Sequence, residues 1–328
     1  RDLEKAQFQL ENPFSELGIK NEVVEAAITT MCKECLKDSG LDNKSILRTK
    51  NMFALGLVCW LFQRDVKIGE KILREKFAKK PEIAEANVQV LYAGYQFGAN
   101  THASVSMSYR VPSKNQKAHG RYMDINGNKA TAYGLMAAAE KAGLQLYLGS
   151  YPITPATDIL HELAKHKSLG VKTVQCEDEI AGCASAVGAA FAGALAVTTT
   201  SGPGICLKSE AMNLAVITEL PLVIVDVQRG GPSTGLPTKS EQTDLLQALY
   251  GRNGESPMPV IAASSPTDCF DAAYTACKIA LEHMTPVVLL SDAYIANGSA
   301  AWKLPNLEEY PSINPPYVTP DMASYWTP

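Results

Sequence analysis

The chain has 328 residues, 46% of them hydrophobic, which is enough apolar material for a packed core in one large domain or two. Its formal net charge is −4 and its basic residues are scattered, so the sequence predicts neither nucleic-acid binding nor a membrane-surface patch. No apolar run reaches the roughly 20 residues that cross a bilayer, and no signal-peptide pattern opens the chain, so we expect a cytoplasmic protein.

The first part of the chain, residues 1–97, is predicted to be mainly helical. Its periodic segments predict helices at Asn21–Lys37, Asn51–Gln63, Lys67–Lys79 and Pro81–Gly94. Residues 98–127 are polar and broken by proline and glycine, which predicts a linker. The chain begins at Arg1 and ends in a proline-rich stretch, so we expect both ends to be incomplete.

From residue 128 onward, apolar helical segments alternate with short β-rich runs. This alternation predicts an α/β fold, a mostly parallel sheet sandwiched by helices, over residues 128–300. The predicted strands are Gln145–Gly149, Lys172–Cys176, Ala194–Thr200, Leu222–Val227, Val260–Ala263 and Pro286–Leu290. The predicted helices are Lys129–Ala142, Thr157–His166, Glu179–Ala192, Ile205–Glu219, Glu241–Gly251 and Asp268–Met284. Residues 301–328 are predicted to be a tail that leads to a further domain.

The eight cysteines lie in apolar or helical contexts, which is typical of free thiols in a reducing compartment. Cys32 and Cys35 form the only CxxC, with no second pair at the spacing of a zinc or iron–sulfur site. We therefore predict no metal site on this chain.

Ligands of parallel α/β sheets bind beyond the carboxyl ends of the strands, and the segments at those ends are unusual here. The first predicted strand is followed by YPITP, in which two prolines stiffen the backbone around Thr154. The second is followed by Glu177, Asp178 and Glu179 and then by a helix of small residues. The third leads into SGPG at Ser201, and the fourth into the glycine-rich loop QRGGPSTG, in which Arg229 offers a planar fork for a carboxylate.

Each feature alone also has a structural explanation. Acidic residues commonly cap a helix start, SGPG can be a turn, and an arginine can lie at the surface. Neither GxGxxG nor GxxxxGKS/T occurs, which argues against ordinary nucleotide binding. The joint occurrence at four successive strand ends favours a functional site.

The runs YPITP, EDEIAG, TTTSGPG, ELP and QRGGPSTGLPT, in this order and spacing, resemble the pyrimidine-binding domain of 2-oxoacid:ferredoxin oxidoreductases. The stretches KNMFALG and KPEIAEAN resemble the end of the γ domain that some members fuse ahead of the α subunit. The RGGPSTGLPT form is similar to α subunits of the 2-oxoglutarate type and related α subunits more than to single-chain pyruvate enzymes. The resemblance implies oxidative decarboxylation of a 2-oxoacid with coenzyme A to an acyl-CoA, here succinyl-CoA, with reduction of ferredoxin.

The resemblance also implies roles for single residues. Glu179 matches the carboxyl that hydrogen-bonds the aminopyrimidine ring of thiamine diphosphate and promotes ylid formation, with Glu177 as the competing candidate. Thr154 matches the hydroxyl near the substrate and the thiazolium centre, and Arg229 the cation for the oxoacid carboxylate. The remaining expected contacts are Pro152, Ile153, Ser201 and Gly202 to the cofactor, and Ser233 and Thr234 to the substrate.

A GDG motif for the pyrophosphate and Mg²⁺ is absent, as is a cysteine set for an iron–sulfur cluster. In the family both the Mg²⁺ site and the 4Fe-4S cluster lie on the β subunit. The resemblance therefore implies half an active site, inactive alone, within an (αβ)2 assembly that meets ferredoxin and coenzyme A.

Two alternatives stay open on the sequence. One is an α subunit for another 2-oxoacid, such as pyruvate, a branched-chain or an aryl oxoacid. The other is a non-catalytic assembly module on the same scaffold, although a scaffold has no need for Glu179, Thr154 and Arg229 together.

Overall fold

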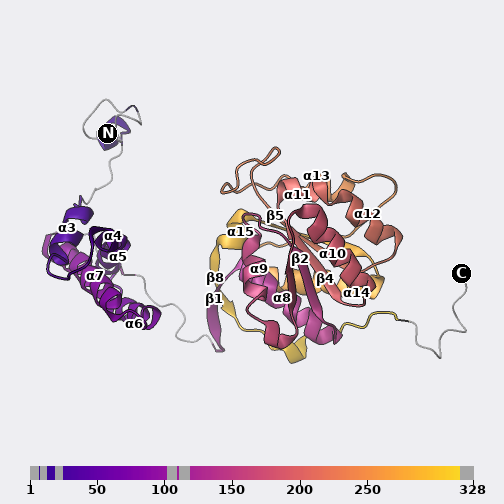
Figure 1. Cartoon of the computed structure of the whole chain (residues 1–328), viewed down its shortest axis with the longest axis horizontal. Coiled ribbons are helices and arrows are strands. Elements are labelled where there is room, and N and C mark those ends of the chain that lie inside the picture. The colour runs from indigo at the N-terminus through magenta and orange to yellow at the C-terminus, as the bar shows by residue number, and fades with distance from the viewer. Residues whose placement is uncertain (1–6, 8–12, 19–24, 102–108, 111–118, 318–328) are drawn as a thin grey trace, which may run out of the picture. The chain divides into compact units, whose positions relative to one another are not determined.

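The structure, a computed structural model, describes residues 7, 13–18, 25–101, 109–110 and 119–317. The chain divides into two compact units, residues 1–118 and 119–328, and each is described by itself (Figure 1).

The first unit is helical, with α2 (Pro13–Glu16), α3 (Ile28–Cys35), α4 (Asn43–Arg48), α5 (Lys50–Leu61), α6 (Val66–Lys76) and α7 (Pro81–Thr101). Residues 21–24 of the first predicted helix lie outside the described residues, and α3 begins at Ile28. Helix α7 starts at Pro81 as predicted but runs past Gly94. A Cβ at Gly94 would lie 2.0 Å from the carbonyl oxygen of Phe53, so this glycine permits close packing of α7 on α5 and does not end the helix.

The second unit contains a six-stranded parallel sheet, which confirms the predicted fold class. Its strands are β2 (Leu146–Ser150), β3 (Lys172–Gln175), β4 (Leu195–Thr200), β5 (Leu222–Gln228), β6 (Val260–Ala262) and β7 (Pro286–Asp292). Their order is β3-β2-β4-β5-β7-β6, and every neighbouring pair is parallel. The first and last residues of all six strands lie within two residues of the predicted ones.

Helices cover both faces of this sheet (Figure 1). One core includes residues of α8 (Gly127–Ala142), α9 (Thr157–Leu163) and α14 (Asp268–His283), and the other includes residues of α10 (Glu179–Phe191) and α12 (Ser209–Ile217). The shorter helices are α11 (Gly202–Leu207), α13 (Leu245–Tyr250), α15 (Ala293–Asn297), and the 3-10 helices η1 (Lys167–Leu169) and η2 (Leu307–Glu309).

Two helix predictions are wrong in detail. The single helix predicted over Ile205–Glu219 is divided into α11 and α12 at Lys208, where the backbone makes a local turn. The helix predicted from Glu241 begins only at Leu245, because Gln242 and Asp244 are held by hydrogen bonds to neighbouring strand ends.

A separate antiparallel pair joins β1 (Tyr122–Asn126) to β8 (Ser299–Lys303). The expected linker is therefore wrong for residues 122–126, and the expected tail is wrong for residues 301–303, because these segments are strands. A pairing between segments so far apart in sequence leaves no local pattern, which is why the sequence did not indicate it. Trp302 of β8 is buried against Phe270 of α14, so the pair is part of the core.

Candidate active site

The order of the strands reverses direction at β2. The chain leaves β2 for β3 on one side and then returns to β4 on the other side. The loops after β2 and β4 therefore depart in opposite directions, and this reversal is where open parallel sheets bind their ligands. The loops concerned are residues 151–156 and residue 201, which leads into α11.

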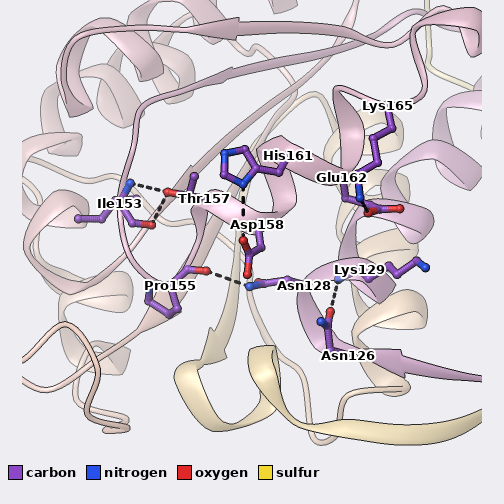
Figure 2. Close-up of polar contacts among 10 residues, drawn as sticks. All are labelled: Asn126, Asn128, Lys129, Ile153, Pro155, Thr157, Asp158, His161, Glu162 and Lys165. Carbon is purple, nitrogen blue, oxygen red and sulfur yellow. Dashed lines mark hydrogen bonds and ion pairs between the residues drawn. The ribbon is translucent and has the colours of Figure 1, made fainter. Parts of the chain in front are cut away.

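The loop after β2 is fixed from beneath by hydrogen bonds (Figure 2). The buried Asn128 of α8 donates its Nδ2 to the carbonyl oxygen of Pro155 at 2.9 Å. Thr157 Oγ1 accepts from the Ile153 amide at 2.7 Å and donates to the Ile153 carbonyl at 2.9 Å. Thr154 is exposed at the surface of this braced loop, as is Pro152, and Ile153 is half-buried.

Glu179 is the first residue of α10, where a side-chain cap begins the helix. Asp178 Oδ1 accepts from the Ala181 amide at 2.8 Å. Glu177 and Asp178 are exposed and Glu179 is half-buried. Helix α10 lies directly on β2, and Gly149 of β2 permits this close approach. A Cβ at Gly149 would come within 2.5 Å of the carbonyl oxygen of Gly182 in α10.

Tyr151 is where the expected catalytic residues converge. Its side chain is 4% exposed, and its hydroxyl lies 2.9 Å from Thr200 Oγ1 at the end of β4. Burial raises the pKa of the Tyr151 hydroxyl, the neighbouring Glu179 carboxylate raises it further, and Arg229 acts in the opposite direction. A Cβ at Gly204 would lie 2.3 Å from the Tyr151 hydroxyl oxygen and 2.8 Å from Glu179 Cγ. The last glycine of SGPG is therefore required for this convergence.

Arg229 joins the loop after β5 to the loop after β2. It is 3% exposed, and it donates Nη1 to the Thr154 carbonyl at 2.6 Å and Nη2 to the Thr234 carbonyl at 2.8 Å. Its Nε has no partner in the described residues. Ser233 and Thr234 are exposed. The structure thus brings Arg229 and Thr154 together through the Thr154 backbone, and the carboxylate-binding role of Arg229 stays a prediction.

Ser201 and Gly202 lie at the start of α11. Ser201 is buried, and its hydroxyl has no hydrogen-bond partner in the described residues. A Cβ at Gly202 would lie 3.4 Å from Asp244 Oδ2, so this position is not sterically restricted to glycine. Their cofactor-binding roles also stay predictions.

Sequence reasoning missed three buried polar groups near these loops. They are the Tyr151 hydroxyl, the ammonium of Lys208, and the carboxyl of Asp226, which lies beside the half-buried Asp244. A signal for two of them was present, because Lys208 interrupts an apolar helical pattern and Asp226 interrupts the apolar strand LVIVDV. Tyr151 gave no comparable signal, since a buried tyrosine is an ordinary core residue.

Comparison with known proteins identifies the family. Residues 137–326 match the model described as pyruvate flavodoxin/ferredoxin oxidoreductase, thiamine diphosphate-binding, and residues 9–97 match that of pyruvate ferredoxin/flavodoxin oxidoreductase. The chain belongs to this oxidoreductase family. The two matches confirm the resemblance that the motifs indicated in both parts of the chain.

Relatives within the oxidoreductase family are also similar over most of this chain. The 2-oxoglutarate oxidoreductase subunit KorA of Mycobacterium tuberculosis is 53% identical over 98% of this chain and 49% of its own length. Subunit alpha of 2-oxoacid:ferredoxin oxidoreductase 1 of Aeropyrum pernix is 33% identical over 87% of this chain and 44% of its own length. The structure of 2-oxoglutarate:ferredoxin oxidoreductase from Magnetococcus marinus, with 2-oxoglutarate, coenzyme A and succinyl-CoA bound, has a TM-score of 0.72 and 35% identity, covering 87% of this chain and 48% of that one. The chain therefore spans about half the length of these relatives.

Proposed function

We propose that this chain forms the pyrimidine-binding side of the active site in the α subunit of a 2-oxoglutarate:ferredoxin oxidoreductase. The reaction is decarboxylation of 2-oxoglutarate with coenzyme A to succinyl-CoA and carbon dioxide, with electrons passed to ferredoxin. The observation that carries this proposal is the convergence of Glu179, the Thr154 loop and Arg229 around Tyr151 at the β2–β4 reversal. The names of the relatives support the choice of oxoacid.

The residues at this reversal of the sheet fit thiamine diphosphate. The Glu179 carboxylate forms no ion pair with a described residue, and Ser201 Oγ and Arg229 Nε are buried polar atoms without a partner among the described residues. Buried polar atoms without partners, such as Ser201 Oγ and Arg229 Nε, are expected where a ligand completes the hydrogen bonding. When bound, the cofactor supplies an ylid carbon that acts as nucleophile and electron sink.

The chain's own groups have distinct tasks in this proposal. Glu179 holds a proton between its carboxyl oxygen and a ring nitrogen of the pyrimidine, and its neighbour Tyr151 fixes the position of that carboxyl. Pro152 and Ile153 line the pyrimidine pocket. The Thr154 hydroxyl, exposed on its braced loop, contacts the oxoacid, while Arg229, Ser233 and Thr234 form the side that meets the oxoacid carboxylate.

The remaining half of the site is assigned to a β subunit. The sequence lacks a GDG motif, and the described residues contain no group of three His, Cys, Asp or Glu side chains that could hold a metal ion. We therefore assign Mg²⁺ and the 4Fe-4S cluster to that partner, within an (αβ)2 assembly. An exposed apolar surface supports a partner, since Phe191 of α10 and Ile217 of α12 are 82% and 81% exposed.

The location proposed for the protein is the cytoplasm. All eight cysteines are free thiols, which fits a reducing compartment. No helix in the described residues is long and apolar enough to span a membrane.

The test uses the full-length α protein with its β partner, thiamine diphosphate, Mg²⁺ and coenzyme A. Oxoacid-dependent reduction of ferredoxin or a viologen dye is measured for the wild type, Glu179→Gln and the matched Glu177→Gln. We expect turnover with 2-oxoglutarate, a loss of at least about 100-fold in Glu179→Gln, and near-wild-type turnover in Glu177→Gln.

Each other outcome would revise the proposal differently. Turnover only with pyruvate, a branched-chain or an aryl oxoacid would keep the mechanism and change the substrate. An active Glu179→Gln variant would remove the role of Glu179. Failure of the wild type with every oxoacid would favour the non-catalytic assembly module.

A further inference from the structure

Lys208 is a lysine with no exposed surface, at the junction of α11 and α12. Its Nζ donates to the carbonyl oxygen of Glu179 at 3.0 Å and to Thr198 Oγ1 of β4 at 2.9 Å. The same Nζ lies 5.1 Å from the centre of the Tyr151 ring. Within the described residues no carboxylate forms an ion pair with it.

Burial of this ammonium is costly. Removing a charged group from water disfavours the charged form, and burial accordingly lowers the pKa of Lys208, while the nearby Cys183 and Glu179 act in the opposite direction. A methionine would fill a similar volume without this cost. The cost of burying the ammonium is offset by its contacts with a carbonyl, a hydroxyl and the face of an aromatic ring. These contacts involve three separate elements that meet at the site.

The contact with Glu179 is the informative one. The carbonyl that Lys208 binds belongs to the residue whose side chain is expected to act on the cofactor. Glu177 and Asp178 before α10 and Ile180 in its first turn are exposed, so the Lys208 ammonium contacts the start of this helix from its buried side. A hydrogen bond from Lys208 to the Glu179 backbone fixes the origin of that side chain relative to β4.

We propose that Lys208 is the positioning residue for Glu179, connecting the first turn of α10 to Thr198 of β4 and to the Tyr151 ring. It does not touch the reacting atoms and acts through the Glu179 backbone. This inference rests on the proposed function, because its catalytic consequence requires Glu179 to be the carboxyl that serves the cofactor.

The first experiment uses the chain without cofactor or partner. Amide hydrogen exchange at Ala181 and Gly182, whose N–H groups bond to Asp178, is compared in the wild type and in Lys208→Met. A hydrogen bond from a charged donor is worth about 1.5–3 kcal/mol, so we expect exchange at these amides to be about tenfold faster or more. Lys172→Met removes an exposed lysine at the start of β3 and serves as the control, with unchanged exchange at these two amides.

The second experiment uses the αβ complex and separates positioning from general stability. For Lys208→Met we expect kcat per folded active site to fall about 10- to 100-fold with little change in KM for the oxoacid, because the carboxyl is misplaced while the oxoacid contacts remain. In Lys208→Ala, ethylammonium should restore turnover saturably. Tetramethylammonium has the charge without N–H donors, so it should not.

The outcomes distinguish this inference from the function on which it rests. A wild type inactive with every oxoacid refutes the proposed function, while the exchange experiment still tests the anchor. Unchanged exchange, unchanged kcat per folded chain, or equal rescue by tetramethylammonium would each overturn the positioning role. If Lys208→Met does not fold, Lys208→Gln, which keeps an N–H donor without the charge, replaces it. A fall in kcat relative to the wild type supports the role, and a wild-type kcat overturns it.

Discussion

The close contact between β2 and α10 gives a way to move Glu179 without substituting any polar side chain. A Cβ built at Gly149 would lie 2.3 Å from Ser185 Oγ and 2.5 Å from the carbonyl oxygen of Gly182. The hydroxyl of Ser185 can rotate away, but the carbonyl belongs to the backbone of α10. In Gly149→Ala that backbone must therefore withdraw by about 0.5 Å to reach even 3.0 Å, and it takes Glu179 with it.

The expected cost of Gly149→Ala has a structural and a catalytic part. Overpacking of this kind destabilises a protein by about 1–3 kcal/mol. A displacement of about 1 Å can reduce an enzymatic rate about 100-fold, so a shift of half that size should lower kcat about tenfold. The stability change is measured from amide exchange in β2 and β4, and kcat is measured in the αβ complex.

Gly188→Ala is the matched control on the same helix. A Cβ at Gly188 meets nothing within 4 Å, so alanine should stabilise α10 by up to about 1 kcal/mol and leave kcat unchanged. A Gly149→Ala variant with wild-type stability would refute the packing argument. Lost stability with wild-type kcat would refute the link between the position of α10 and catalysis.

Two further predictions concern the buried ionisable side chains of Arg229 and Asp226. Arg229→Lys keeps the positive charge but cannot bridge the Thr154 and Thr234 carbonyls in the same way, so KM for the oxoacid should rise about tenfold or more in steady-state kinetics; an unchanged KM would remove the role of Arg229. Asp226 has no exposed surface, and burial together with the neighbouring Asp244 raises its pKa well above 3.8. The native state then binds the proton more tightly than the unfolded state, so stability falls as pH rises from 3.8 through the raised pKa. Asp226→Asn should flatten this dependence and raise stability at pH 8 by about 1–3 kcal/mol in urea titrations at several pH values, whereas an unchanged slope would refute the assignment.

The parts of the structure that were predictable depend on local pattern. Four of the six strands, β2, β4, β5 and β7, are short, mostly buried apolar runs, and a buried parallel strand of this kind is recognisable without knowledge of its neighbours. The candidate site was predictable for a related reason. Parallel strands place their carboxyl ends at one edge, so loops that are unusual at four successive strand ends must lie near one another.

The parts that were missed depend on contacts between distant segments. The pairing of Tyr122 with Lys303 joins residues at opposite ends of the second unit. The partners of the buried Lys208 ammonium, the Glu179 carbonyl and the Thr198 hydroxyl, lie on α10 and β4 and likewise leave no local pattern around Lys208. The role of Tyr151 as the common neighbour of Glu179 and Arg229 likewise requires the fold before it can be recognised.

One face of the central strands shows how a buried sheet accommodates this polar site. Thr198, Thr200 and Asp226 point to the same face, because alternate residues of a strand share a face and Thr200 is paired with Asp226. Earlier in the same strands that face is apolar, with Ala196, Leu222 and Ile224 in the core. The polar groups are therefore confined to the carboxyl ends, where Lys208 and Tyr151 form hydrogen bonds with the two threonines and Asp244 is the neighbour of Asp226. The apolar core and the candidate site thus occupy opposite ends of the same strands, so polar residues that interrupt an apolar strand near its carboxyl end are the sequence signal to search for in this fold.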